Sequence, residues 1–143
     1  ATTPMERIVR IDELATWLSA NASADKRLQA NVVDELILLL FADYRFAEAV
    51  PYLKRAVTLY RSLGERDRAA MCKVAYGDVL RTLGETDRAL RIYETQARRL
   101  SELKATMLWV QTRFRVVAIW LQKRRFEKAR DELTTRLLPV AER

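Results

Sequence analysis

The sequence contains no histidine, one cysteine (Cys72), three glycines and three prolines among its 143 residues. A single thiol without histidine excludes a disulfide within the chain and a zinc site built from His and Cys ligands. We expect Cys72 to be a small buried apolar residue, as unpaired cysteines usually are. The scarcity of glycine and proline, beside abundant Leu, Ala, Arg and Glu, predicts an all-α fold with short connections.

Long hydrophobic runs are also missing, since no apolar segment approaches the ~20 residues that span a bilayer. The glycines are isolated, so they form no phosphate-binding loop, and no pair of carboxylates stands out from the charges of helix surfaces. We therefore expect no membrane segment, no cofactor, no metal, no catalytic residues and no independent enzyme. The chain begins at Ala1 without a signal-like segment, and we interpret it as a piece of a longer, cytoplasmic protein.

The net charge of +7 is unevenly distributed. Residues 1–70 carry ten acids and ten bases, whereas residues 111–143 carry four acids and nine bases. A basic surface favours nucleic acid or an acidic partner domain, because phosphate binding is driven by counterion release. The alternative is a solvated helix face, partly neutralised by Glu127, Asp131 and Glu132. The predicted basic patch consists of Arg113, Arg115, Lys123, Arg124, Arg125 and Lys128.

A period of 40 residues runs through the chain. Ala49, Ala89 and Ala129 share this spacing, and three further apolar columns keep it: Leu36, Tyr76 and Val116; Leu40, Leu80 and Trp120; Leu53, Tyr93 and Leu133. Aligned apolar columns at a fixed spacing are typical of stacked helical repeats. We predict one domain over residues 1–143, with an N-terminal helix in 1–22 and helix pairs in 26–63, 66–102 and 104–141.

The central copy, Tyr76-Gly77-x-x-Leu80 followed by Ala89-x-x-x-Tyr93, resembles the tetratricopeptide repeat (TPR). The resemblance covers residues 31–143. It implies a right-handed, TPR-like α-solenoid of about seven antiparallel helices. The 40-residue period is longer than that of the usual repeat and is similar to long-helix arrays of bacterial signalling and regulatory proteins.

The resemblance also implies a function: a non-catalytic scaffold domain, within a larger signalling or transcription-regulatory protein, that binds a protein or peptide in a concave groove. Alternatively, the groove residues pack against neighbouring helices, or the chain is a basic module that contacts nucleic acid. A homodimer through Leu137, Leu138 and Val140 is a further alternative. Carried over position by position, the groove is lined by Asn31, Asp34, Leu38, Phe41, Met71, Val74, Asp78, Arg81, Gln111, Phe114, Ala118 and Leu121.

Overall fold

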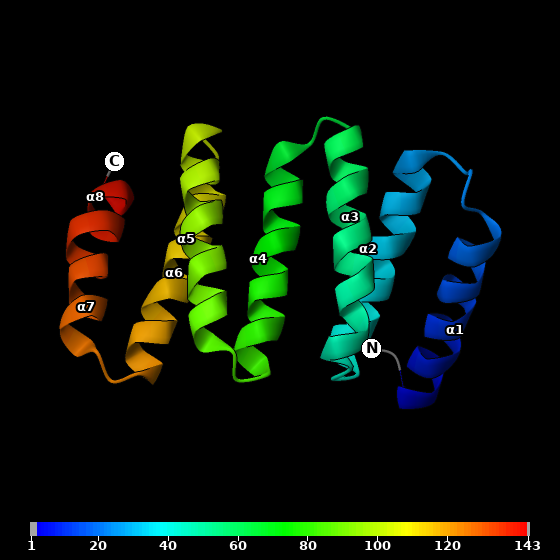
Figure 1. Cartoon of the computed structure of the whole chain (residues 1–143), viewed down its shortest axis with the longest axis horizontal. Coiled ribbons are helices and arrows are strands. Elements are labelled where there is room, and N and C mark those ends of the chain that lie inside the picture. The colour runs from blue at the N-terminus through cyan, green and yellow to red at the C-terminus, as the bar shows by residue number, and fades with distance from the viewer. Residues whose placement is uncertain (1–2, 143) are drawn as a thin grey trace. The chain divides into compact units, whose positions relative to one another are not determined.

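The computed structural model describes residues 3–142, which form helices joined by short turns (Figure 1). The chain divides into two compact units, residues 1–73 and 74–143. The first unit holds α1 (Pro4–Ala20), α2 (Lys26–Ala42), α3 (Phe46–Ser62) and the beginning of α4 (Arg66–Thr82). The second holds the end of α4, α5 (Thr86–Glu102), α6 (Thr106–Gln122), α7 (Phe126–Asp131), the π-helical segment η1 (Glu132–Leu137) and α8 (Leu138–Ala141).

No strand occurs among residues 3–142, and consecutive helices pack against each other within each unit. The predicted all-α architecture of antiparallel, TPR-like helices is therefore confirmed. The predicted domain limits at residues 1 and 143 lie outside the described residues, and the single repeat domain stays a prediction. Within the described part of the chain, no helix has both the length and the apolar character needed to cross a membrane.

The helices follow a regular spacing of 20 residues. Each helix from α2 to α6 has 17 residues and is followed by a three-residue turn. In the first of these turns the Arg45 amide donates to the Leu40 carbonyl at 2.9 Å, and the Tyr44 amide donates to the Phe41 carbonyl at 3.1 Å. This pair of bonds is the Schellman motif, which satisfies carbonyls left free at a helix end. The 40-residue period is thus made of two helix-turn segments of equal length.

All five turns require a left-handed residue at the centre. The central residues, which all have positive φ, are Tyr44, Gly64, Gly84, Lys104 and Arg124. Glycine adopts this conformation without steric cost, whereas the Cβ of the other three residues crowds the backbone. Two turns therefore have the favoured glycine at the left-handed position. The other three adopt the same left-handed conformation with a non-glycine residue, at a steric cost.

The start of each of the first two helices is fixed by a side chain. Thr3 and Glu6 form a capping box at α1, in which the Glu6 amide donates to Thr3 Oγ1 at 3.1 Å. Pro4 occupies the first helical turn, where its missing N–H is not needed. At α2 the Asp25 carboxylate accepts from the Leu28 amide at 3.2 Å. These contacts set where the chain enters the first unit's helices.

The predicted apolar columns form much of the core. In the first unit, Ala49 and Leu53 of α3 are buried, as is Leu36 of α2. In the second unit, Ala89 and Tyr93 of α5 are buried. Small alanines at this position let paired helices approach closely, which is why the period was visible in the sequence. The columns are not uniformly buried, because Tyr76 and Trp120 are half-buried and Leu133 is exposed.

The last helical rod, which ends the predicted helix pair 104–141, is not a single α-helix. It changes to a π-helix at Glu132 and returns to an α-helix at Leu138. Thr134 donates its hydroxyl to the Arg130 carbonyl at 2.9 Å, and Thr135 donates to the Asp131 carbonyl. Threonine hydroxyls that bind carbonyls one turn back compete with backbone amides and bend helices. Two consecutive threonines of this kind accompany the wider turn.

Candidate protein-binding surface

In the first unit, the predicted groove residues lie along α2 with unequal exposure. Asn31 and Leu38 are exposed, whereas Asp34 and Phe41 are half-buried. The hydroxyl of Tyr60, on α3, donates a hydrogen bond to the Asp34 carboxylate. This contact holds an acidic group beside an exposed apolar side chain.

Tyr60 is fixed by its surroundings as well as by Asp34. Its ring lies 5.7 Å from the guanidinium carbon of Arg68, a cation–π distance. Burial, followed by the hydrogen bond to Asp34, raises the pKa of Tyr60 to about 12. The phenol therefore stays protonated and donating near neutral pH, so Asp34 keeps a permanent partner.

In the second unit, a charge cluster surrounds Asp78 of α4. Arg115 Nε, on α6, lies 2.9 Å from Asp78 Oδ1 and 3.1 Å from Oδ2. The Tyr93 hydroxyl donates to Oδ1, and Arg81 Nη2 lies 4.0 Å from the same oxygen. Burial and the neighbouring Asp78 raise the pKa of Tyr93 above its ordinary value. Asp78 is therefore held by donors from three helices and carries little uncompensated charge.

Gly77 makes this cluster sterically possible. A Cβ atom at Gly77 would lie 2.8 Å from Cε1 of Tyr93 and 3.2 Å from its Cδ1. Only a glycine lets the buried ring pack this closely against α4. The glycine of the TPR-like motif is thus a packing residue that places the Tyr93 hydroxyl at Asp78.

An apolar strip lies next to the cluster on α6. Phe114, Ala118 and Leu121 are spaced four and three residues apart, so they share one face of the helix. Phe114 is 52% exposed and Leu121 is 49% exposed, while Ala118 is half-buried. Gln111, one turn before Phe114, is exposed, and its carbonyl accepts from Arg115 Nη1 at 3.1 Å. The strip therefore runs along one face of α6, and its two large side chains are about half open to solvent.

Two predicted groove residues on α4, Met71 and Val74, are less exposed to solvent than the two large side chains of the α6 strip. Val74 has no exposed surface, so the expectation that it contacts a partner is wrong. The spacing rule identified the helix but not the rotation that turns this side chain inward. Met71, three residues earlier, is half-buried.

Arg113 was expected in the basic patch but is a core residue. It is only 2% exposed, and its Nε donates to Glu132 Oε2 at 3.1 Å. Its Nη1 donates to Glu94 Oε2 at 2.8 Å, and its Nη2 donates to Glu132 Oε1. A buried guanidinium needs such compensation. Arg113 joins α5, α6 and η1 and is unavailable to an external anion, which corrects the prediction.

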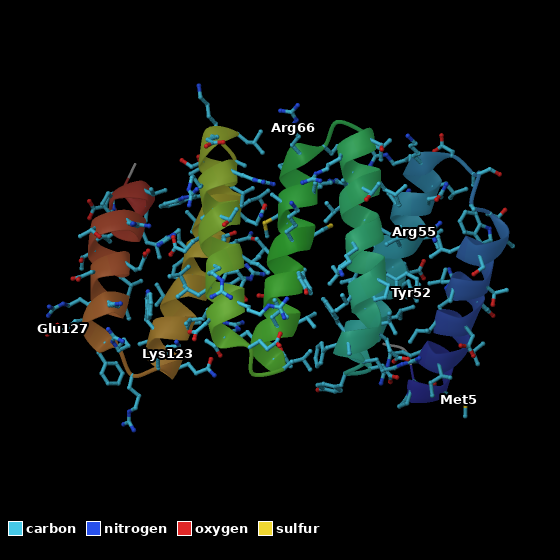
Figure 2. The ribbon with its side chains drawn as sticks, in the orientation of Figure 1. Met5, Tyr52, Arg55, Arg66, Lys123 and Glu127 are labelled. Carbon is cyan, nitrogen blue, oxygen red and sulfur yellow. The ribbon has the colours of Figure 1, made fainter. Side chains whose placement is uncertain are left out.

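The remaining predicted patch residues divide into paired and exposed groups. Arg115 is bound to Asp78, and Lys123, in the turn between α6 and α7 (Figure 2), donates to Asp87. Arg124 and Arg125 are exposed, and Lys128 Nζ lies 4.5 Å from the centre of the Trp120 ring. The nucleic-acid hypothesis now depends on these last three cations and stays a prediction.

The expected homodimer surface needs a similar correction. Leu137 is 5% exposed and belongs to a small core cluster with Val117 and Ala129, so it cannot mediate self-association. Leu138 is exposed and Val140 is half-buried. The homodimer itself remains untested.

Sequence reasoning missed the polar contacts that organise these clusters, which are made by Tyr60, Tyr93, Glu94 and Glu132. The two Asp–Tyr contacts stand at different positions of the 40-residue repeat, since Asp34 aligns with Val74 and Asp78 aligns with Leu38. No periodic signal therefore marks them. Glu132 was expected on a solvated face but is buried, and this could have been found, because it follows the core residue Ala129 by three positions and so shares its face of the helix.

The fold defines an all-α helical-repeat protein. A family model, the tetratricopeptide repeat, matches residues 28–100, and the chain belongs to this family. The matched region spans the two helix pairs from α2 to α5. No curated protein and no solved structure matches the chain. TPR domains are in general non-catalytic scaffolds for protein–protein interaction. Membership of the family therefore indicates this class of function.

Proposed function

We propose that the α6 face of the second unit binds an apolar segment of a protein partner. The observation that supports this most is the pair Phe114 and Leu121, two large apolar side chains that are about half exposed on one helix face. Burying a side chain of this kind contributes about 1.5–3 kcal/mol relative to leaving it in water. Two such anchors, two turns apart, form a recognition element for a helix or an extended peptide.

The Asp78 cluster forms the polar edge of this surface. Its carboxylate is already bound by Arg115 and Tyr93, so a partner's apolar side chain could approach without stranding an unpaired charge. Apolar anchors bordered by ordered polar groups that exclude water are the usual arrangement of energetically important interface contacts. The geometry therefore favours an apolar segment with a polar edge.

On the first unit, Leu38 and Asp34 of α2 form a second, smaller contact of the same proposed function. Here the apolar group lies beside a carboxylate that accepts a hydrogen bond from Tyr60 and forms no salt bridge with residues 3–142. The setting we propose is a larger cytoplasmic signalling or transcription-regulatory protein of bacterial origin. That setting rests on the similarity of the long repeat to such arrays.

The experiment is a selection of peptides from a random 12-residue display library on the whole chain, followed by affinity measurement of the selected peptides. We expect the F114D/L121D variant to weaken binding by about tenfold or more, because two apolar contacts are replaced by charges. The matched control is L83D/F126D, which changes the same residue types at 56% and 58% exposure elsewhere in the second unit. Unchanged affinity in F114D/L121D, or an equal loss in the control, would overturn the proposal.

A further inference from the structure

A cavity of about 660 Å³ lies in the second unit, at the end of α5 and the beginning of α6, and η1 and α8 complete its wall. Its apolar lining comes from Leu100, Trp109, Pro139 and Val140. None of the lining residues belongs to the surface proposed for the protein partner. The volume is within the range of pockets that bind small organic ligands, about 300–1,000 Å³.

The polar lining of the cavity is cationic. It includes Lys104 and Arg136 with the hydroxyl residues Ser101, Thr106 and Thr135, and it includes no acidic residue. Lys104 forms no salt bridge with any residue between 3 and 142. The Arg136 guanidinium is 3.6 Å from Glu132, whose carboxylate already accepts two hydrogen bonds from Arg113. Both cations therefore have donors to spare for an anion.

Arg136 lies in the π-helical segment η1 and forms part of this wall. The equivalent positions one and two repeats earlier are Gln96 and Ala56, both of which are buried in the core. In the last rod, Thr135 and Arg136 stand inside η1 and line the cavity, and the Arg136 side chain is exposed. Wider helical turns of this type frequently occur at functional sites. At this position the last copy therefore has an exposed cation where the two earlier copies have buried side chains.

We propose that this cavity binds an amphipathic anion, a carboxylate or phosphate group on an apolar body. The anionic group would lie between the Lys104 ammonium and the Arg136 guanidinium, which can bind two oxygens at once. The apolar body would pack on Trp109, Pro139 and Val140. Such a ligand makes use of both kinds of lining, whereas an inorganic anion uses only one.

The test is NMR titration of the ¹⁵N-labelled whole chain with phenyl phosphate, phenylacetate and inorganic phosphate. The indole N–H signals of Trp17, Trp109 and Trp120 provide three reporters, of which Trp17 lies in the other unit. We expect phenyl phosphate, phenylacetate or both to shift the Trp109 signal saturably and to leave the Trp17 signal unchanged. The tighter of the two assigns the anion as phosphate or carboxylate.

Variants then locate the site. K104M and R136M should each weaken binding by about fivefold, close to the loss of 1 kcal/mol in contact energy. The control R125M removes one exposed cation outside the cavity and should leave the affinity within about twofold. Circular dichroism of each variant verifies that it is folded. Equal affinities in K104M, R136M and R125M would overturn the proposal, as would inorganic phosphate binding as tightly as phenyl phosphate, or no Trp109 shift with any probe.

Discussion

The two units both place an aspartate of one helix against a tyrosine of another, but they leave the two carboxylates in different electrostatic states. Asp34 accepts from Tyr60, and no salt bridge reaches it from the described residues. Asp78 accepts from Tyr93 and is also bound by Arg115. The first unit therefore keeps a negative acceptor beside Leu38, whereas the second unit presents apolar side chains beside a neutralised cluster.

The buried polar groups of the units differ in the same way. In the first unit the buried polar residue Gln29 is neutral; its amide donates to the Ala24 carbonyl at 2.7 Å and its oxygen accepts from Arg55 at 3.0 Å. In the second unit the buried polar residues include a charged pair, Arg113 and Glu132. The comparison teaches that the repeat fixes where helices lie, while each unit uses its own polar contacts to join them.

The largest expected effect comes from removing the buried charge. R113M should lower the free energy of unfolding by about 3–5 kcal/mol, because Glu132 is left buried without its main partner. Q29L in the first unit should cost only about 1–3 kcal/mol, since the carbonyls it strands are uncharged and Arg55, which loses the Gln29 oxygen, is only half-buried. Urea denaturation measures both.

R136M is the matched control for the same carboxylate. Arg136 is exposed and lies at the longer distance of 3.6 Å from Glu132, so its loss should cost less than about 1 kcal/mol. A cost for R113M no larger than that for R136M would contradict the charged-core account of the second unit.

Alkaline pH should reveal the Asp34–Tyr60 contact. The pKa of Tyr60 is raised to about 12, and in the unfolded chain a tyrosine has a pKa of about 10. The folded state therefore holds its proton more tightly, so the stabilisation is complete below pH ~10 and is lost as the pH rises toward ~12. The loss should be about 2 kcal/mol at the upper end.

Substitution by phenylalanine isolates this effect. Y60F should show a shallower fall in stability between pH 10 and 12 than the wild type, measured by urea denaturation at each pH. Y44F changes an exposed tyrosine and should follow the wild-type curve. Parallel curves for Y60F and wild type would mean that the Tyr60 proton is not held by the fold. Y93F should extend the comparison to higher pH, because the pKa of Tyr93 is raised further.

Gly77 offers a smaller perturbation of the second unit. G77A should destabilise the protein by about 1–2 kcal/mol, because the clash with Tyr93 outweighs the better helix propensity of alanine. In a Y93L background the cost of G77A should fall, since the ring that meets the new methyl group is gone. Additive costs in the double mutant would show that the two residues are not in contact.

The turns should respond equally in both units, and the effect is the smallest. Y44G in the first unit and R124G in the second should each raise stability by about 0.5–1 kcal/mol, because glycine removes the strain of positive φ. L103G, at a residue with φ of −78°, should lower stability instead. Thermal unfolding of the three variants checks the signs, and a loss in Y44G would show that its turn needs the tyrosine.

The features that could be predicted from the sequence are those that repeat. The alanine and leucine columns exist because paired helices need small and apolar residues at constant offsets. These columns identified the all-α repeat fold and the positions of its helices, including α6. Phe114 and Leu121 were expected from the TPR resemblance, position by position, and their contact with a partner stays a prediction. Arg113 and Val74 were misplaced because a small rotation of a helix decides whether a residue points inward, and spacing does not determine that rotation.

The polar clusters could not be predicted for a different reason. The Tyr93 and Asp78 contact depends on a ring packed onto Gly77, and the Arg113 contacts join three helical segments. These interactions depend on three-dimensional positions that occur once in the chain. The π-helical turn at Glu132 is equally local, since it accompanies two consecutive threonines near the end of the last rod.

The most direct measurement of the proposed function is site-specific photo-crosslinking to a selected peptide. A benzoylphenylalanine replaces Phe114 in one protein and Phe126 in another, two phenylalanines of similar exposure in the second unit. If α6 carries the binding surface, the peptide is captured at position 114 and not at position 126. Capture at 126 alone, or equal capture at both positions, would contradict the account.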